Sequence, residues 1–110
     1  MASRKKLTLS VVLSPTVVDD LHGIWRWNAE HHSPAHADAY IAFLKARIYG
    51  LSRYFRQGRI VSARPDLRYF LIRRKARGQG HVAVYRFDDK EIDILHVFHT
   101  AQDWQSKLAE

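Results

Sequence analysis

Three side chains near the end of the sequence, Arg86, His96 and His99, have the chemical properties that a site acting on a phosphate group requires. An imidazole titrates near neutrality and therefore accepts or donates protons, and an arginine fork binds phosphate oxygens. In a β-strand, residues three apart point to opposite faces, so His96 and His99 act side by side only if the strand bends. We expect His99 to have a surface or functional role and His96 to be packed and hydrogen-bonded.

Basic residues are concentrated in the second half of the chain. The net charge is +7, and the segment from Arg53 to Arg86 alone carries a net charge of +9. Its basic residues are Arg53, Arg56, Arg59, Arg64, Arg68, Arg73, Arg74, Lys75, Arg77 and Arg86. This distribution fits a face that binds an anionic partner, either a nucleic acid or an acidic protein. A basic surface that only aids solubility fits it about equally well.

A metal or cofactor site is not indicated by the sequence. The chain has no cysteine, which excludes thiolate zinc sites, thiolate catalysis and disulfides. His31, His32 and His36 surround a predicted helix start, but a metal site there needs a further ligand from elsewhere. We therefore interpret these histidines as surface residues and expect neither a metal nor a cofactor.

The length of 110 residues and the apolar content of 46% fit one small domain spanning residues 1–110. No apolar run approaches the roughly 18 residues that a membrane-spanning helix needs. The first 14 residues lack the uninterrupted apolar region of a signal peptide. The sequence therefore predicts a cytoplasmic protein without a membrane segment.

The first half of the chain predicts one strand and two helices. Alternating apolar residues over 7–13 indicate a strand with one buried face. Ser14-Pro15 then supplies a helix N-cap and a first-turn proline, and this helix ends by His31-His32. Ser33-Pro34 repeats the start signal, and apolar residues at spacings of three and four predict one helix that continues through Gly50 to Phe55. Two such helices are expected to form an antiparallel hairpin.

The second half predicts a meander of three strands at 67–74, 81–87 and 91–99, separated by Gly78-Gln79-Gly80 and Asp88-Asp89. Residues 56–65 are expected to form a loop, with a short extended piece at 59–61. Thr100 is the predicted N-cap of a last helical turn containing Trp104 and Leu108. The order β-α-α-β-β-β predicts an α+β fold, in which the helical hairpin packs on a mostly antiparallel four-stranded sheet.

The meander has apolar residues on both faces. Phe70-Leu71-Ile72 and Ile94-Leu95 give the sheet more apolar side chains than a half-solvated antiparallel sheet requires. The second face therefore needs a cover. A segment of a partner protein and self-association both fit this requirement.

Several motifs, in this order, resemble the ParE branch of the ParE/RelE toxin family. They are Leu13-Ser14-Pro15, Asp20-Leu21, Ile24-Trp25, Pro65-Asp66-Leu67-Arg68, Val84-Tyr85-Arg86 and the ending HVFHTAQDW at 96–104. The resemblance covers nearly the whole chain. It implies a toxin of a bacterial type II toxin-antitoxin system that poisons DNA gyrase and blocks replication. It also implies a hetero-oligomeric complex with a ParD-like ribbon-helix-helix antitoxin, whose C-terminal segment wraps the toxin.

The RelE branch of the same family suggests an alternative, a ribosome-dependent mRNA endoribonuclease. At the position that aligns with a nuclease arginine this sequence has Val82, no tyrosine follows Tyr85, and Trp104 is neither an acid nor a base. These departures favour a gyrase inhibitor over an enzyme. If the chain is a nuclease, Arg86, His96 and His99 are its candidate catalytic residues. A binding module that has lost toxicity is a third possibility.

The resemblance also suggests which residues meet the partners. The candidates for target contact and toxicity are Arg68, Arg73, Arg74, Arg86, His99, Asp103 and Trp104. The candidates for the antitoxin interface are Leu21, Trp25, Ile41, Leu44, Ile48, Leu71, Val82 and Val84, together with Arg73 and Arg74. For Trp104 the alternative is that the indole packs back on the helical hairpin.

Overall fold

The computed structural model describes residues 8–75 and 78–109. Its elements follow the order β1 (Ser10–Leu13), α1 (Pro15–His31), α2 (Pro34–Tyr49), α3 (Leu51–Tyr54), β2 (Arg59–Val61), β3 (Arg64–Ile72), β4 (His81–Phe87), β5 (Glu91–His99) and α4 (Trp104–Ala109). The predicted strands at 81–87 and 91–99 have the predicted bounds. Leu7, the predicted first residue of the first strand, and Arg77 of the basic segment lie outside the described residues.

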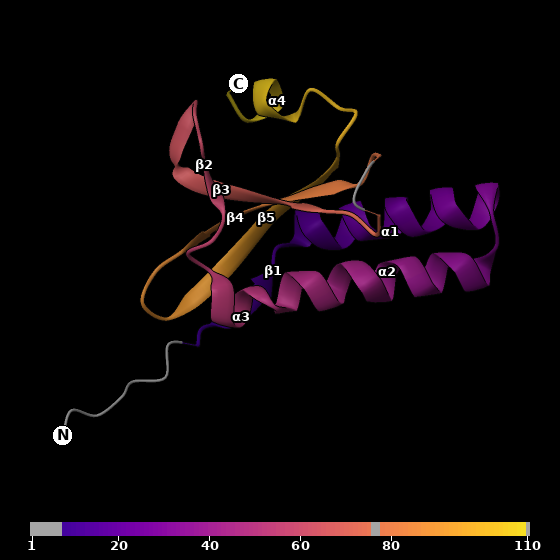
Figure 1. Cartoon of the computed structure of the whole chain (residues 1–110), viewed down its shortest axis with the longest axis horizontal. Helices are drawn as coiled ribbons and strands as arrows, with labels where there is room; N and C mark the ends of the chain where they lie inside the picture. The colour runs from indigo at the N-terminus through magenta and orange to yellow at the C-terminus, as the bar shows by residue number, and fades with distance from the viewer. Residues whose placement is uncertain (1–7, 76–77, 110) are drawn as a thin grey trace.

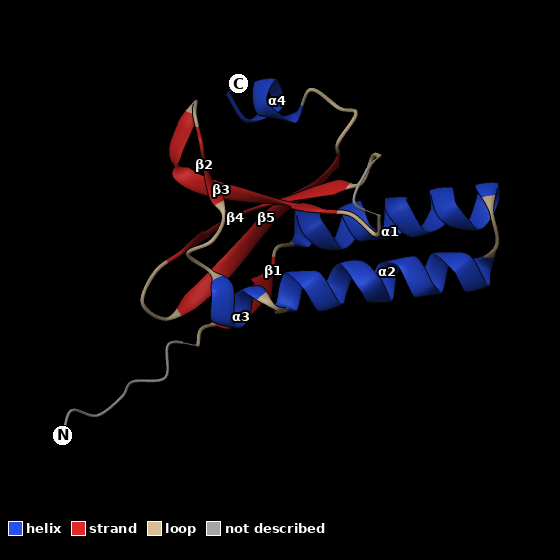
Figure 2. Cartoon of the chain, in the orientation of Figure 1, coloured by secondary structure: helices blue, strands red, loops and turns tan. Residues whose placement is uncertain are grey.

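Two serines set the start of the helical hairpin. The Ser14 hydroxyl accepts a hydrogen bond from the Val17 amide, and the Ser33 hydroxyl accepts one from the His36 amide. Each serine satisfies a backbone donor that the first helical turn leaves free, and each is followed by a proline. The predicted starts of both helices are confirmed. Figure 2 shows the resulting antiparallel pair, α1 and α2, against the sheet.

The prediction of one continuous helix from Pro34 to Phe55 is wrong at Gly50. There α2 ends, and the short helix α3 follows. Glycine is a poor helix former because it loses the most backbone entropy. Gly50 keeps helical dihedral angles (φ −62°, ψ −20°), so the chain direction changes little. Leu51 and Phe55 therefore remain buried, as the apolar spacing predicted.

The sheet has five strands in the order β1-β5-β4-β3-β2, one more than predicted. The additional strand is β2, which pairs antiparallel with β3 and coincides with the short extended piece expected at 59–61. β1 is parallel to β5, and the other pairs are antiparallel. In Figure 1, α1 and α2 cover one face of the sheet and α4 lies on the other side. The α+β fold with a helical hairpin is confirmed.

β5 contains a bulge that changes which residues face each other across the sheet. Tyr85 pairs with Ile94, but Val84 pairs with His96, so Leu95 has no partner in β4. Beyond this point β1 has ended, and α1 takes over the free edge of β5. The Ser14 hydroxyl donates to the Leu95 carbonyl at 3.3 Å, and the Val97 amide donates to Asp20 Oδ2 at 3.0 Å. Side chains of α1 thus replace the missing strand.

The larger core lies between the helices and the sheet. Its buried members are Val17, Leu21, Leu44, Ile48, Leu51, Phe55, Ile72, Ala83, Tyr85, Ile92, Ile94 and Val97. Tyr85 is fully buried, and its hydroxyl donates to the Phe55 carbonyl and accepts from the Gly58 amide. These two bonds hold the loop before β2 against the sheet. No room exists for a side chain at Gly58, because a Cβ there would collide with the Tyr85 hydroxyl.

A second, smaller core covers the opposite face, and its buried members are Val61, Leu67, Val82, Val84, Trp104 and Leu108. Trp104 packs against Tyr69 and Phe98, with ring centroids 4.8 and 6.3 Å away. The expectation that Trp104 packs back on the hairpin is therefore wrong, because the indole lies on the other side of the sheet. The chain's own α4 supplies part of the cover expected from a partner.

Thr100 has a different role from the predicted N-cap. α4 begins only at Trp104, and the Thr100 hydroxyl accepts a hydrogen bond from the Gly80 amide at 3.0 Å. The Thr100 amide donates to the Gly80 carbonyl at the same distance. A Cβ at Gly80 would collide with the Ile72 carbonyl, so this position requires glycine. The two bonds fix the start of β4 against the end of β5.

Candidate functional site

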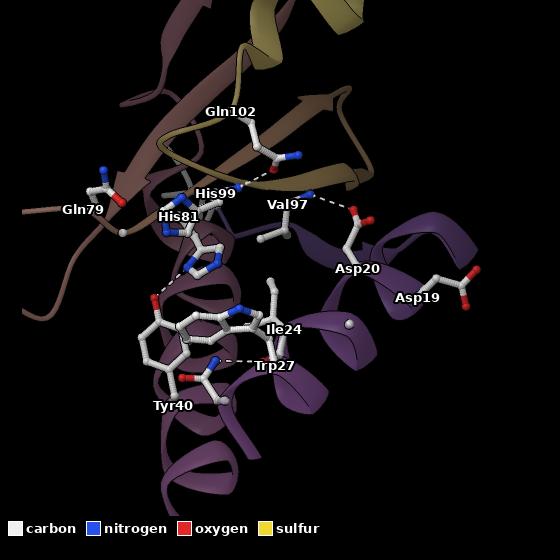
Figure 3. A pocket seen from close by; sticks show the side chains of 13 residues that line it. Asp19, Asp20, Ile24, Trp27, Tyr40, Gln79, His81, Val97, His99 and Gln102 are labelled. Atoms are coloured by element: carbon white, nitrogen blue, oxygen red, sulfur yellow. Dashed lines mark hydrogen bonds between the residues drawn. The ribbon is translucent and has the colours of Figure 1, made fainter. Parts of the chain in front are cut away.

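A cleft of about 770 Å³ opens between α1 and the paired ends of β4 and β5. Its walls come from α1, α2, the turn before β4 and the end of β5 (Figure 3). The lining residues are Asp19, Asp20, Gly23, Ile24, Trp27, Asn28, Tyr40, Gln79, Gly80, His81, Val97, His99 and Gln102. A volume of this size, with several converging polar groups, is typical of binding sites.

His81 is the most buried titratable side chain in the cleft, with 7% of its surface exposed. Its Nδ1 is 2.6 Å from the Tyr40 hydroxyl. No fully buried side-chain nitrogen or oxygen of the described residues lacks a hydrogen-bond partner, so the remaining nitrogen, Nε2, reaches the cleft. Burial, with a smaller contribution from nearby His99, lowers the pKa of His81 to about 4. The imidazole is therefore neutral at pH 7.

His99 faces His81 across the β4–β5 ladder. The two rings meet edge to face, with centroids 5.2 Å apart. The Ala101 amide donates to His99 Nδ1, so the neutral ring carries its proton on Nε2. The His99 amide donates to Gln102 Oε1 at 2.8 Å, which leaves the amide group of Gln102 as a donor. Donors from the end of β5 thus line the upper wall of the cleft in Figure 3.

Asp20 supplies a carboxylate to the opposite wall. One of its oxygens accepts from the Val97 amide, and Figure 3 shows the side chain turned toward β5, whereas neighbouring Asp19 points away. Burial raises the pKa of Asp20, opposed by the Val97 hydrogen bond and by the charge of His96. Burial also raises the pKa of Tyr40, against the effect of Arg74. The guanidinium of Arg74 lies 5.5 Å from the Tyr40 ring centroid.

The three candidate catalytic residues of the nuclease alternative, Arg86, His96 and His99, do not lie close together. His99 lies on the helix side of the sheet, in the cleft. His96 pairs with Val84, lies on the side of α4 and stacks on Phe98 at 4.9 Å. Arg86 is at the far end of β4, where it pairs with Asp93 at 3.5 Å. A general acid, a general base and a phosphate-binding cation must meet within hydrogen-bond reach, so this set is not assembled.

The basic candidates fall into two groups. Arg68 donates to the carbonyls of Arg56 and Gly58, at 3.1 and 2.9 Å, and so braces the loop before β2. Arg73 and Arg74 follow the end of β3 and are exposed. Asp103 is also exposed, whereas Trp104 is 8% exposed. Direct target contact by the Trp104 indole is therefore inconsistent with its packing in the smaller core.

The antitoxin candidates also fall into two groups, buried and accessible. Five of them, Leu21, Leu44, Ile48, Val82 and Val84, are buried within the chain itself. The helical stripes and the second sheet face that carry them are covered by other parts of the same chain. Trp25 and Leu71 are 37% and 43% exposed, and Ile41 is partly exposed. Only these three apolar candidates have surface that a partner can reach.

Among the cleft residues, His99 is a site candidate from the sequence, whereas Asp20, Tyr40 and His81 are not. The sequence places His81 only as the first residue of a predicted strand. The available signal was the short turn between β4 and β5, which places the start of one strand beside the end of the other.

Comparison with known proteins shows the family. Residues 11–104 match the family described as the ParE toxin of the type II toxin-antitoxin system, parDE. The chain belongs to the ParE toxin family. A solved structure titled as the chromosomal ParDE toxin-antitoxin system from P. aeruginosa is similar to this chain, with a TM-score of 0.72 and 22% identity. The match covers 84% of this chain and 96% of the other. A search of curated proteins gave no match.

Two further observations concern the described residues of this ParE-family chain. Across residues 8–75 and 78–109, no group of three or more histidine, aspartate or glutamate side chains is arranged to hold a metal ion. None of the helices in those ranges combines the length and the apolar character needed to cross a membrane. The predicted resemblance to the ParE branch is confirmed by the family match.

Proposed function

We propose that this ParE-family chain poisons DNA gyrase in the bacterial cytoplasm and is neutralised there by a cognate ParD-like ribbon-helix-helix antitoxin in a hetero-oligomeric complex. The observation that carries the proposal is the family match, which runs from β1 to the start of α4. Gyrase poisoning requires binding surface and no catalytic group of the toxin. The dispersed positions of Arg86, His96 and His99 support this proposal over the ribonuclease alternative.

The exposed arginines at the end of β3 are the best-supported candidates for contact with an anionic partner. Arg73 and Arg74 have no acid partner among the described residues, since the ion pairs there are Arg64–Asp66 and Arg86–Asp93. An arginine fork suits both phosphate oxygens and the carboxylates of an acidic antitoxin. Leu71, on the same strand, adds exposed apolar surface. We assign Arg73, Arg74 and Asp103 to target contact. We assign Arg73 and Arg74, together with Trp25, Ile41 and Leu71, to the antitoxin interface.

The test is a supercoiling assay with purified gyrase, combined with detection of trapped cleavage complexes. We expect inhibition and trapped complexes, both weakened about tenfold in the double variant Arg73→Ala, Arg74→Ala because two charge-assisted contacts are lost. Arg26→Ala, which removes an exposed arginine from α1, is the matched control and should retain full inhibition. No inhibition at saturating toxin would refute the proposal.

A ribosome assay run in parallel separates the alternative. If the pure protein cleaves mRNA in the ribosomal A site, and His99→Ala or Arg86→Ala abolishes the cleavage, the chain is a RelE-like ribonuclease. If gyrase is inhibited and mRNA stays intact, the gyrase proposal stands. Adding the antitoxin should restore supercoiling, and the double arginine variant should need more antitoxin for the same restoration.

A further inference from the structure

The cleft beside α1 contains a carboxylate, that of Asp20, which forms no ion pair among the described residues. Asp20 is held by one hydrogen bond from the Val97 amide, and the ion pairs among residues 8–75 and 78–109 involve other acids. Asp20 lines the cleft, and Asp19 precedes it on the same helix. In a chain with net charge +7, this wall is a local site of negative charge. A negative wall repels phosphates and attracts a cation.

The rest of the cleft, including a second residue of α1, is suited to a flat cation. Trp27 is 54% exposed although it lines the cleft, and His31 stacks on its ring at 4.1 Å, which fixes the orientation of the indole. An indole ring is the strongest cation–π partner among the side chains. His81 is neutral and therefore does not repel a cation. Its Nε2 faces the cleft from a side chain that is more than nine-tenths buried.

We propose that this cleft receives an arginine side chain from a partner protein, with the guanidinium between the Trp27 ring and the Asp20 carboxylate. A guanidinium is planar, stacks on aromatic rings and pairs with carboxylates, so it matches both side chains better than an ammonium group does. In Figure 3 both side chains extend from α1, Asp20 beside Val97 and Trp27 further along the helix near His81. This inference does not depend on gyrase being the target.

The neighbourhood of the cleft indicates a partner segment as the occupant. Arg74 packs over Tyr40, which lines the cleft, so exposed positive charge borders the cleft on the side of α2. A segment with an arginine between acidic residues would pair with both, the arginine with Asp20 and an acid with Arg74. A small free cation would use only one of these charges. The charge pattern therefore favours a peptide over a small molecule.

The test is an NMR titration of the full chain with the blocked tripeptide acetyl-Glu-Arg-Glu-amide, followed through the Trp27 indole N–H signal. We expect saturable shifts confined to the cleft. The same peptide with citrulline, a neutral isostere of arginine, should bind about tenfold more weakly, because the cation–π and carboxylate contacts need the charge. Equal binding of the citrulline peptide, or no saturable shift, would overturn the proposal.

Two variants and one matched control locate the site. Trp27→Ala removes an exposed side chain and should weaken binding about tenfold without affecting the fold. Asp20→Asn keeps an acceptor for the Val97 amide but removes the charge, and should weaken binding similarly. Asp89→Asn removes an exposed acid from the turn between β4 and β5 and should leave binding unchanged. Undiminished binding by both cleft variants would overturn the proposal.

Agmatine separates the two possible sources of the guanidinium. It carries the same guanidinium and also an ammonium group, but neither a peptide backbone nor acidic neighbours. We expect agmatine to bind more weakly than the tripeptide, and Arg74→Ala to reduce the affinity for the tripeptide alone. Agmatine binding as tightly as the tripeptide would overturn the assignment to a partner protein and make the cleft a small-molecule site. Gyrase inhibition is measured separately, so either proposal can fail alone.

Discussion

The two faces of the sheet are covered in different ways. On one face, α1 and α2 contribute 17 and 16 residues, and the core between them and the sheet includes fully buried Leu44, Ile48 and Tyr85. On the other face the cover is α4, a helix of six residues anchored by Trp104 and Leu108. An isolated helix of this length is not stable in water, so α4 is helical because its two anchors are packed.

The two covers differ in how much of the chain must unfold before they open. The helix-side core is made by long elements that cannot leave the sheet without unfolding the chain. The α4 side is closed by a short segment whose opening exposes only Val82, Val84 and their neighbours, which is a local event. Three of the accessible candidates for partner contact, Trp25, Leu71 and Arg74, lie on the hairpin and at the end of β3.

The largest expected effect tests the helix-side core. Leu44→Ala removes a fully buried side chain from the middle of α2 and should lower the free energy of unfolding by about 4 kcal/mol, since both apolar burial and packing are lost. Chemical denaturation followed by circular dichroism measures the change. A loss below about 1 kcal/mol would show that the hairpin does not form the main core.

The next effect concerns the cleft at the end of this core. The pKa of His81 is lowered from 6.5 to about 4 by burial, so the unfolded chain binds a proton on this ring more readily than the folded chain. Above pH 6.5 the ring is neutral in both states, and His81 does not lower the free energy of unfolding. As the pH falls from 6.5 toward 4, only the unfolded chain gains the proton, and the free energy of unfolding decreases. Over that window the loss is about 3 kcal/mol.

A non-titrating variant isolates this contribution. His81→Gln keeps a polar group beside Tyr40 but has no proton to gain in this range. Asp20, whose pKa is raised, contributes with the opposite sign in both proteins, so it cancels in the difference. We expect the stability of the wild-type chain to fall more steeply than that of the variant between pH 6.5 and 4. Parallel curves would show that His81 titrates normally in the folded chain.

Residue spacing predicted most of the fold because each signal was local. Ser14-Pro15 and Ser33-Pro34 determine helix starts through hydrogen bonds within three residues. The errors arose where distant parts of the chain decide. The sequence predicts that Thr100 caps the following helix, but its hydroxyl accepts a hydrogen bond from the Gly80 amide, twenty residues away. Burial of Leu21 and Val84 likewise depends on which elements cover them, and apolar periodicity does not specify that.

The cleft could not be predicted either, because it too depends on contacts between distant parts of the chain. From Phe87 paired with Ile92, a regular ladder would place His81 opposite Phe98. The bulge at Leu95 shifts the register by one residue and brings His99 opposite His81 instead. No turn or glycine signal in the sequence marks that bulge. The hydrogen bonds of Ser14 and Asp20 to the free edge of β5 accompany it and come from a helix about 80 residues away.

The smallest expected effect tests the cover on the second face. Leu108→Ala removes the same atoms as Leu44→Ala, but from a short terminal helix, where the neighbouring side chains can move into the space. We expect a loss of about 1 kcal/mol in the free energy of unfolding, together with faster amide hydrogen exchange that is confined to α4. If Leu108→Ala destabilises the chain as much as Leu44→Ala and accelerates exchange throughout β4 and β5, then α4 belongs to the same cooperative unit as the hairpin. In that case the two faces differ only in the size of their covers, and recognition on the α4 side would require global unfolding.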